Sequence, residues 1–200
     1  MAKRTSSGME VLLGLLTIEP MSGYDLGQLI RESIRHFWNE SYGQIYPNLK
    51  QLAAGGFITG KIEKQKGKPD RQIYSITKKG RERLMRWLEV EPQPEIPRNE
   101  LLLKIFFGAQ AGPGTLRNYL ERMLENERAA LQQFGFIERE ISKNTQYPDA
   151  PYWQIALRFG QIEVEAHVRW AEETLAVLQK LSRVKQTPQG SRKEKPHAGE

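Results

Sequence analysis

The sequence predicts a mainly α-helical protein in two parts, the first of which also carries one β-hairpin. Apolar residues recur at spacings of three and four along most of the chain, which is the pattern of helices packed on one side. Alternating apolar residues flank a turn-rich segment around residues 57–77, where a hairpin is expected. A run with three prolines, residues 90–97, disfavours helix and separates the two parts.

These signals divide the 200 residues into four segments. We expect a folded domain over residues 1–89, a proline-rich linker over residues 90–97 and an all-helical domain over residues 98–182. The basic tail, residues 183–200, has no large apolar side chain after Val184 and cannot offset its ordering entropy by burial. We therefore expect the tail to be disordered.

The composition excludes several classes of protein. Without cysteine the chain can form no disulfide, no thiol nucleophile and no cysteine-ligated iron–sulfur or zinc site. No apolar run approaches the roughly 18 residues that cross a bilayer, and no hydrophobic segment follows the first charged residues as in a signal peptide. We expect a cytoplasmic protein.

The net charge of +6 is distributed unevenly along the chain. Residues 1–89 hold 15 Lys and Arg against 9 Asp and Glu, whereas residues 90–182 hold 10 against 13. Such a division suggests that the first part meets a polyanion and the second part meets protein.

Two helices are expected at the start of the first domain. Residues 9–18 are apolar on all sides and end before Glu19-Pro20, as in a short buried helix. Ser22 is suited to cap a second helix that runs from Gly23 to about Trp38, with apolar residues on one face.

The most informative helix is expected between Ser41 and the glycine pair at residues 55–56. Ser41 with Gln44 three residues later fits a capping box, and the glycines supply a C-terminal stop. Pro47 is tolerated because the residue four positions before it is Gly43. The inward face is formed by Ile45, Leu49 and Leu52.

The hairpin is expected to pair residues 57–63 with residues 71–77, with Ile58 and Ile62 on one face. Its turn, residues 64–70, contains Gly, Pro and Asp. Thr77 then caps a helix that runs to about Glu89. The tip of the hairpin is basic and carries Lys61, Lys64, Lys66, Lys68 and Arg71.

Three helices, a basic hairpin and a further helix form a winged helix-turn-helix. A helix rich in small and amide side chains can enter a major groove, and a lysine-tipped hairpin can reach the phosphates beside it. The alternative is a small α+β domain whose lysines merely face solvent.

The first domain resembles the PadR family of transcriptional regulators. The resemblance is carried by Ser22-Gly-Tyr-Asp-Leu26, Phe37-Trp38, Ser41-x-Gly43-Gln-Ile-Tyr-Pro47, Gly56-Phe-Ile58 and Arg71-x-x-Tyr74-x-Ile76-Thr77-x-x-Gly80. The second part is similar to the virulence-activator-type C-terminal domain of the family's larger branch, from Arg98-Asn-Glu-Leu-Leu-Leu-Lys104 and Phe106-Phe-Gly108 onward.

The resemblance implies a homodimer that binds a palindromic operator in double-stranded DNA, usually as a repressor. It makes residues 41–52 the recognition helix and residues 61–71 the wing. The DNA-facing candidates on the helix are Ser41, Gln44, Tyr46, Pro47, Asn48 and Lys50, and those on the wing are Lys61, Lys64, Lys66, Lys68 and Arg71.

The second domain is expected to form three helices and to dimerise. A short apolar helix over residues 99–109 precedes a long one capped by Thr115, and the last helix spans residues 152–181. This last helix is apolar on two faces, more than one partner helix can cover. We assign one face to the dimer interface, with Leu157, Val164, Ala171 and Leu178; the alternative is a monomeric helical bundle.

The sequence gives little support for catalysis, a metal or a cofactor. His36 with Glu40, and His167 with Glu163 and Glu165, are small groups typical of exposed helix faces. The family's response to aromatic compounds implies an effector site, for which the candidates are Trp87, Trp153 and Trp170; the alternative for these residues is ordinary packing.

The functional hypothesis is therefore a PadR-like regulator, a repressor that binds its operator as a homodimer and responds to a small aromatic effector. The alternative is a helical protein-interaction adaptor that uses the winged domain for protein contacts.

Overall fold

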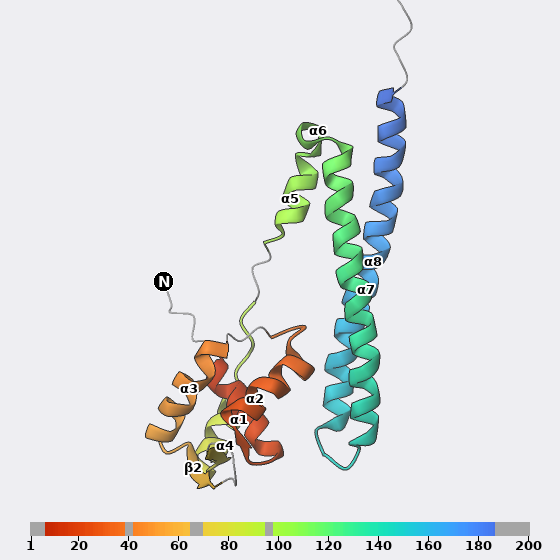
Figure 1. The fold of residues 1–200 in the computed structure, drawn as a ribbon. Helices are drawn as coiled ribbons and strands as arrows, with labels where there is room; N and C mark the ends of the chain where they lie inside the picture. Colours follow the sequence, from red (N-terminus) through yellow and green to blue (C-terminus); the bar gives the residue numbers. More distant parts are fainter. Residues whose placement is uncertain (1–6, 39–41, 65–69, 95–97, 187–200) are drawn as a thin grey trace, which may run out of the picture. The chain divides into compact units, whose positions relative to one another are not determined.

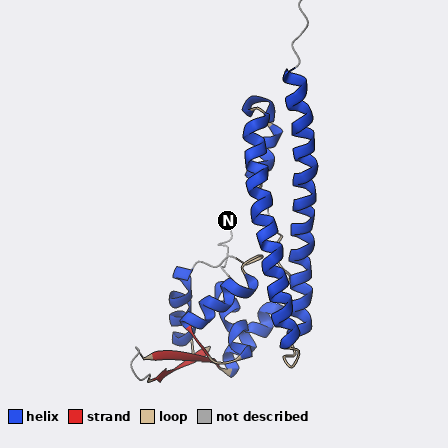
Figure 2. Ribbon diagram, turned by 45° about the vertical axis from the view of Figure 1, so that its right-hand side comes forward, coloured by secondary structure: helices blue, strands red, loops and turns tan. Residues whose placement is uncertain are grey.

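The computed structural model describes residues 7–38, 42–64, 70–94 and 98–186. The chain divides into two compact units, one of residues 1–95 with 139–154 and one of residues 96–138 with 155–200. We call them the N-terminal unit and the helical unit. Helices predominate in both, and the described strands lie in the N-terminal unit (Figures 1 and 2). The mainly α-helical prediction is confirmed.

The N-terminal unit contains the predicted helices and hairpin. In chain order its main elements are α1 (Gly8–Ile18), β1 (Met21–Ser22), α2 (Gly23–Leu29), the π-helical segment η1 (Ile30–Ile34), α3 (Tyr42–Ala54), β2 (Ile58–Glu63), β3 (Arg71–Ile76) and α4 (Lys78–Leu88). Ser22 and Thr77 cap α2 and α4 as expected, because their side-chain oxygens accept from the backbone N–H groups of Asp25 and Gly80.

The second predicted helix does not continue as an α-helix to Trp38. It changes to π-helical geometry at Ile30 and ends at Ile34. The Ser33 hydroxyl donates to the carbonyl of Leu29 at 2.5 Å, a competition for backbone acceptors that weakens regular helix.

The sheet has three antiparallel strands in the order β1-β3-β2. The predicted hairpin pairs Ile58 with Ile76 at its root and Glu63 with Arg71 towards its tip. The third strand was not predicted, since β1 has only two residues and exists through its pairing with β3.

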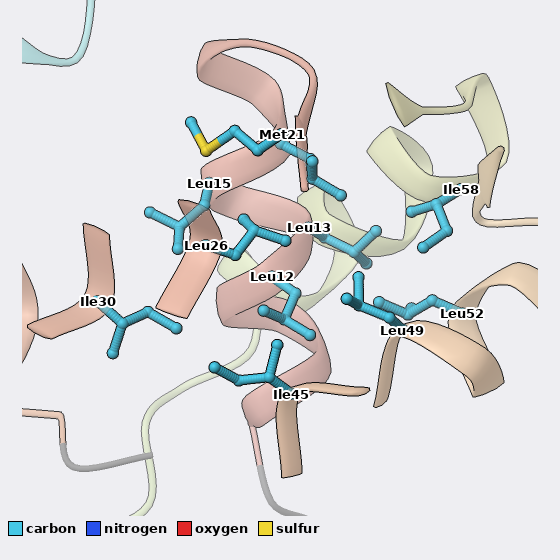
Figure 3. Packing of buried hydrophobic residues seen from close by; sticks show 11 residues of the cluster. Leu12, Leu13, Leu15, Met21, Leu26, Ile30, Ile45, Leu49, Leu52 and Ile58 are labelled. Carbon is cyan, nitrogen blue, oxygen red and sulfur yellow. The ribbon is translucent and has the colours of Figure 1, made fainter. Parts of the chain in front are cut away.

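The core of the N-terminal unit surrounds α1. Side chains of α2, α3 and the root of β2 converge on this helix (Figure 3). Ile58 is buried there, whereas Ile62, on the same face of the strand, is 66% exposed. The hairpin extends beyond the core after its first residues, and nothing in the described chain covers Ile62.

The helical unit is built on α7 (Pro113–Lys143) and α8 (Ala150–Gln186), preceded by α5 (Glu100–Phe106) and α6 (Gly108–Ala111). Within the unit, α7 and α8 run side by side in opposite directions (Figure 1). Leu116, Leu120 and Leu124 of α7 pack in one core with Ala171 and Leu178 of α8.

Both long helices begin earlier than predicted. The helix expected to be capped by Thr115 begins at Pro113, where a missing N–H costs nothing, after Gly112 with φ +79°. The last helix begins at Ala150 with Pro151 in its first turn, and it continues to Gln186, into the segment expected to be disordered. The remainder of that tail lies outside the described residues.

Candidate nucleic-acid interface

Helix α3 separates an apolar face from a polar one. Ile45, Leu49 and Leu52 are buried in the core, as predicted. The residues proposed to face DNA lie on the remaining surface: Gln44, Tyr46, Pro47 and Lys50 are exposed and Asn48 is half-buried. Ser41 lies outside the described residues. The arrangement leaves amide and lysine side chains on the part of the helix surface that the core does not cover.

The start of α2 packs directly on α3. A Cβ added to Gly23 would lie 2.8 Å from Cε1 of Tyr46 and 3.2 Å from Cδ1 of Leu49. Only glycine allows this approach, and the contact fixes one side of the Tyr46 ring while about half of the residue stays exposed, at 51%.

The wing contributes two lysines to the described surface. Lys61 in β2 and Lys64 after it are both exposed, whereas Lys66 and Lys68 lie outside the described residues. Lys50 on α3 is exposed as well, and exposed lysines are suited to contact phosphate groups.

Arg71, the fifth basic residue proposed to contact DNA, is instead engaged within the protein. Its Nη2 donates to Oδ2 of Asp25 and, at 3.0 Å, to Oγ of Ser22. The side chain is only 36% exposed. Arg71 therefore ties β3 to the start of α2, and its contact with DNA stays a prediction.

Asp25 is the acceptor at the centre of this group. Its Oδ2 accepts from the backbone N–H of Ser22 at 3.1 Å and from the Ser22 hydroxyl at 2.8 Å, which completes a capping box. Partial burial raises the pKa of Asp25, but the hydrogen bonds from Ser22 and the charge of Arg71 outweigh it, so the pKa lies below its ordinary value. The Ser-x-x-Asp spacing in the sequence is typical of a capping box. The contact of Asp25 with Arg71 joins residues 46 positions apart, so no local pattern predicts it.

The three tryptophans proposed for an effector site have different surroundings. Trp87 is exposed on α4, Trp153 pairs with Tyr147 at 5.8 Å between ring centroids, and Trp170 packs against the core of the helical unit. Among the described residues no two of these tryptophan rings are paired.

An open surface depression of about 450 Å³ lies between α5 and α7 of the helical unit. Leu101, Tyr119 and Met123 are among its lining residues, with Lys104 and Arg122. The Nζ of Lys104 lies 5.3 Å and the Cζ of Arg122 lies 5.6 Å from the centroid of the Tyr119 ring. Sequence reasoning missed this site, because its residues show no pattern other than that of two amphipathic helices.

The proposed dimer residues on α8 are used inside the chain. Leu157, Ala171 and Leu178 are buried and Val164 is half-buried, although no second copy is present. The chain itself already covers these side chains, so they offer little surface to a second copy. The other apolar face of α8 is open, with Ile155, Phe159 and Ile162 all exposed.

Of the polar groups noted in the sequence, the structure describes the one around His167 in full. Within the part of the chain that the structure describes, no group of three or more His, Asp or Glu side chains is placed to hold a metal ion. His167 places Nδ1 3.1 Å from Oε1 of Glu127, which joins α8 to α7. Glu40 lies outside the described residues. The described helices include none that is both long and apolar enough to cross a membrane.

Two family models match the chain in succession. The model of the transcriptional regulator PadR-like family matches residues 12–86, and that of the virulence activator alpha C-terminal domain matches residues 97–179. A curated relative, the negative transcriptional regulator PadR of Bacillus subtilis, is 29% identical over 175 residues, covering 84% of this chain and 96% of the relative.

Solved structures show the same similarity. The crystal structure of B. subtilis PadR in complex with operator DNA gives a TM-score of 0.76 at 27% identity, covering 88% of this chain and 99% of that one. The structure of the same regulator with p-coumaric acid gives a TM-score of 0.67 at 26% identity, covering 89% and 99%.

Proposed function

Because the chain belongs to the PadR-like family of transcriptional regulators, we propose that it is a repressor that binds a palindromic operator as a homodimer. The family consists of regulators rather than enzymes, in agreement with the sequence analysis. A relative named a negative transcriptional regulator supports repression. A relative solved in complex with operator DNA supports an operator as the ligand of this chain. Such a protein works beside the chromosome, so a cytoplasmic location is part of the proposal.

The observation that carries the proposal is the polar side of α3 beside the basic hairpin. Gln44 and Asn48 present amides, which can pair with base edges in a major groove. Lys50, Lys61 and Lys64 are exposed and can neutralise phosphates on either side. We propose that base reading comes from α3 and that the lysines of the wing, including Lys66 and Lys68, supply affinity without sequence preference.

We propose that the second copy covers the open face of α8. Ile155, Phe159 and Ile162 lie at spacings of three and four, so they form one stripe along the helix. Phe159 is 65% exposed, an unfavourable position for a large apolar ring that stays in water. Burial of this stripe would pair two chains and hold two recognition helices at a spacing near one DNA turn, about 34 Å.

We propose that a small aromatic acid is the effector and that it occupies the depression between α5 and α7. The relative bound to p-coumaric acid supports an aromatic ligand. The Tyr119 ring with Leu101 and Met123 offers contacts for an aromatic ring. Arg122 offers a charge for a carboxylate, whereas Lys104 is already paired with Glu100 at 2.8 Å. Calorimetric titration with p-coumaric acid tests this: Arg122→Ala should weaken binding, and no heat of binding to the wild type at millimolar ligand would reject the site.

Footprinting of the region upstream of the protein's own gene tests the main function. A repressor should protect an inverted repeat, and its affinity should fall steeply as salt rises. An adaptor that uses the winged domain for protein contacts should protect no sequence and show little salt dependence. The second result would overturn the proposal.

A further inference from the structure

Helix α3 ends in a turn that leaves three carbonyl groups in need of partners. Gly56, with φ +72°, donates its N–H to the Ala53 carbonyl at 3.0 Å, and Phe57 donates to the Leu52 carbonyl at 2.9 Å. This is a Schellman motif, in which a glycine in left-handed conformation closes the helix. The carbonyl oxygens of Gly55, Gly56 and Phe57 lie past the last residue of α3, so their partners must come from outside the helix.

The first turn of α4 satisfies all three carbonyls. The Nζ of Lys79 donates to the Gly55 oxygen at 2.8 Å. The Thr77 hydroxyl lies 2.8 Å from the Gly56 oxygen and 3.0 Å from that of Phe57, which also accepts from the Thr77 N–H at 3.0 Å. Because the C-terminal end of a helix carries partial negative charge, the ammonium of Lys79 is favourably placed there.

The ring of Phe57 continues the connection to the core. The Nζ of Lys79 lies 4.7 Å and the Cζ of Arg83 lies 4.8 Å from its centroid. Arg83 in turn donates to the Glu10 carboxylate of α1 at 2.6 Å. The end of α3 is therefore joined through α4 to the central helix of the N-terminal unit.

We propose that Lys79 is a positioning residue for operator recognition, which fixes the angle of α3 by holding its last turn against α4. This inference rests on the proposed function. The helix has 13 residues and is about 20 Å long, so a rotation of about 5° at its C-terminal end moves its first turn by about 1.7 Å. Hydrogen bonds from Gln44 and Asn48 to base edges tolerate only a few tenths of an ångström. Long lysine side chains on phosphates adapt to such a change.

Loss of the Lys79 contact should therefore lower discrimination between operator and other DNA more than it lowers affinity for DNA in general. A lysine that merely bound phosphate would behave differently. Its removal would weaken binding to all duplexes alike and reduce the slope of log affinity against log salt by about 0.9.

The test compares Lys79→Met with Lys79→Arg and with Lys78→Met, an exposed lysine of the same turn. A duplex selected by the wild-type chain from a randomised pool serves as operator, and a scrambled duplex serves as competitor. We expect Lys79→Met to lower the ratio of the two affinities about fivefold with an unchanged salt slope. Lys79→Arg, which keeps a donor and a cation, should restore most of the ratio, and Lys78→Met should leave it unchanged.

Amide hydrogen exchange gives a readout that does not need DNA. Lys79→Met should speed exchange at Gly55, Gly56 and Phe57 relative to Lys78→Met. The inference is wrong if Lys79→Met leaves the ratio of the two affinities unchanged. It is also wrong if the variant binds both duplexes more weakly to the same extent and its salt slope falls by about 0.9. In either case the regulator proposal stands. If the wild-type chain selects no sequence, the regulator proposal fails and the inference falls with it.

Discussion

The ring of Tyr46 in α3 lies against the backbone of Gly23 at the start of α2, so closely that a Cβ there would be 2.8 Å from the ring. Real side chains essentially never approach a Cβ so closely. The first residue of one helix thus limits where an exposed aromatic residue of the proposed DNA-reading surface can stand.

Gly23→Ala should consequently weaken operator binding and lower stability, because Tyr46 and Leu49 must shift to admit the methyl group. We expect a loss of about 1–3 kcal/mol in the free energy of unfolding, as in other overpacked sites. Chemical denaturation and operator titration measure the two effects.

Gly14→Ala is the matched control. A Cβ at Gly14, in the middle of α1, meets nothing within 4 Å. Alanine is the better helix former by about 0.5–1 kcal/mol, so this variant should be more stable than the wild type. If Gly23→Ala and Gly14→Ala changed the free energy of unfolding equally, the close approach of Tyr46 to Gly23 would not be what destabilises Gly23→Ala.

The Asp25 group should make stability depend on pH in acid. The pKa of Asp25 in the folded protein lies below its ordinary value of 3.8, because bonds from Ser22 and Arg71 outweigh the effect of burial. A lowered pKa means that the ionised form stabilises the fold: its contribution is present above pH 3.8 and is lost as the pH falls through the folded value.

Asp25→Asn should therefore destabilise the protein at pH 6 and have a smaller effect at pH 3. Urea unfolding at the two pH values measures the difference. Lys104 and Glu100 form an ion pair on an exposed helix face and provide a comparison, since Glu100→Gln should change stability little at either pH. An effect of Asp25→Asn that is the same at pH 3 and pH 6 would contradict the assignment.

Substitutions in the wing and in α3 should have separable effects on DNA binding. Replacement of Lys64, Lys66 and Lys68 by alanine should weaken binding to all duplexes and reduce the salt slope by about 2.7, if each neutralises one phosphate. Gln44→Ala should instead cost about 1–3 kcal/mol at particular bases and leave the slope unchanged. If neither change alters binding, the groove assignment is wrong.

Phe159→Glu should convert the proposed dimer into a folded monomer. The ring is exposed in the single chain, so the charge does not disturb the chain's own core but prevents burial against a second copy. Light scattering should give the 23.1 kDa of one chain for this variant and twice that mass for the wild type. Glu163→Ala, an exposed polar position of α8, should remain dimeric. A wild-type chain that stays at the monomer mass at high concentration would refute the interface.

Local signals in the sequence predict much of the N-terminal unit. The caps at Ser22 and Thr77, and the glycine stop after α3, depend on residues within a few positions of each other, and each is confirmed. The partner of Arg71 could not be predicted in this way. Its bond to Asp25 depends on β1 lying beside β3, and a two-residue strand leaves no periodic pattern.

The helical unit shows a second limit. The spacing of apolar residues predicts both apolar faces of α8. It does not predict which of the two faces the chain covers with its own residues. Leu157 and Phe159 are equally apolar and only two positions apart, yet one is buried and the other exposed. The choice depends on how α7 and α8 pack against each other, which no local segment encodes.

The two faces of α8 give this regulator an unusual freedom for design. Because one stripe packs inside the chain and the other is the proposed dimer interface, residues of the second stripe can be changed without altering the first. Opposite charges placed at positions 155 and 162 in two engineered versions should yield obligate heterodimers, each half carrying its own α3. Such heterodimers would bind asymmetric DNA sites, which a homodimer of two identical chains cannot match in both halves.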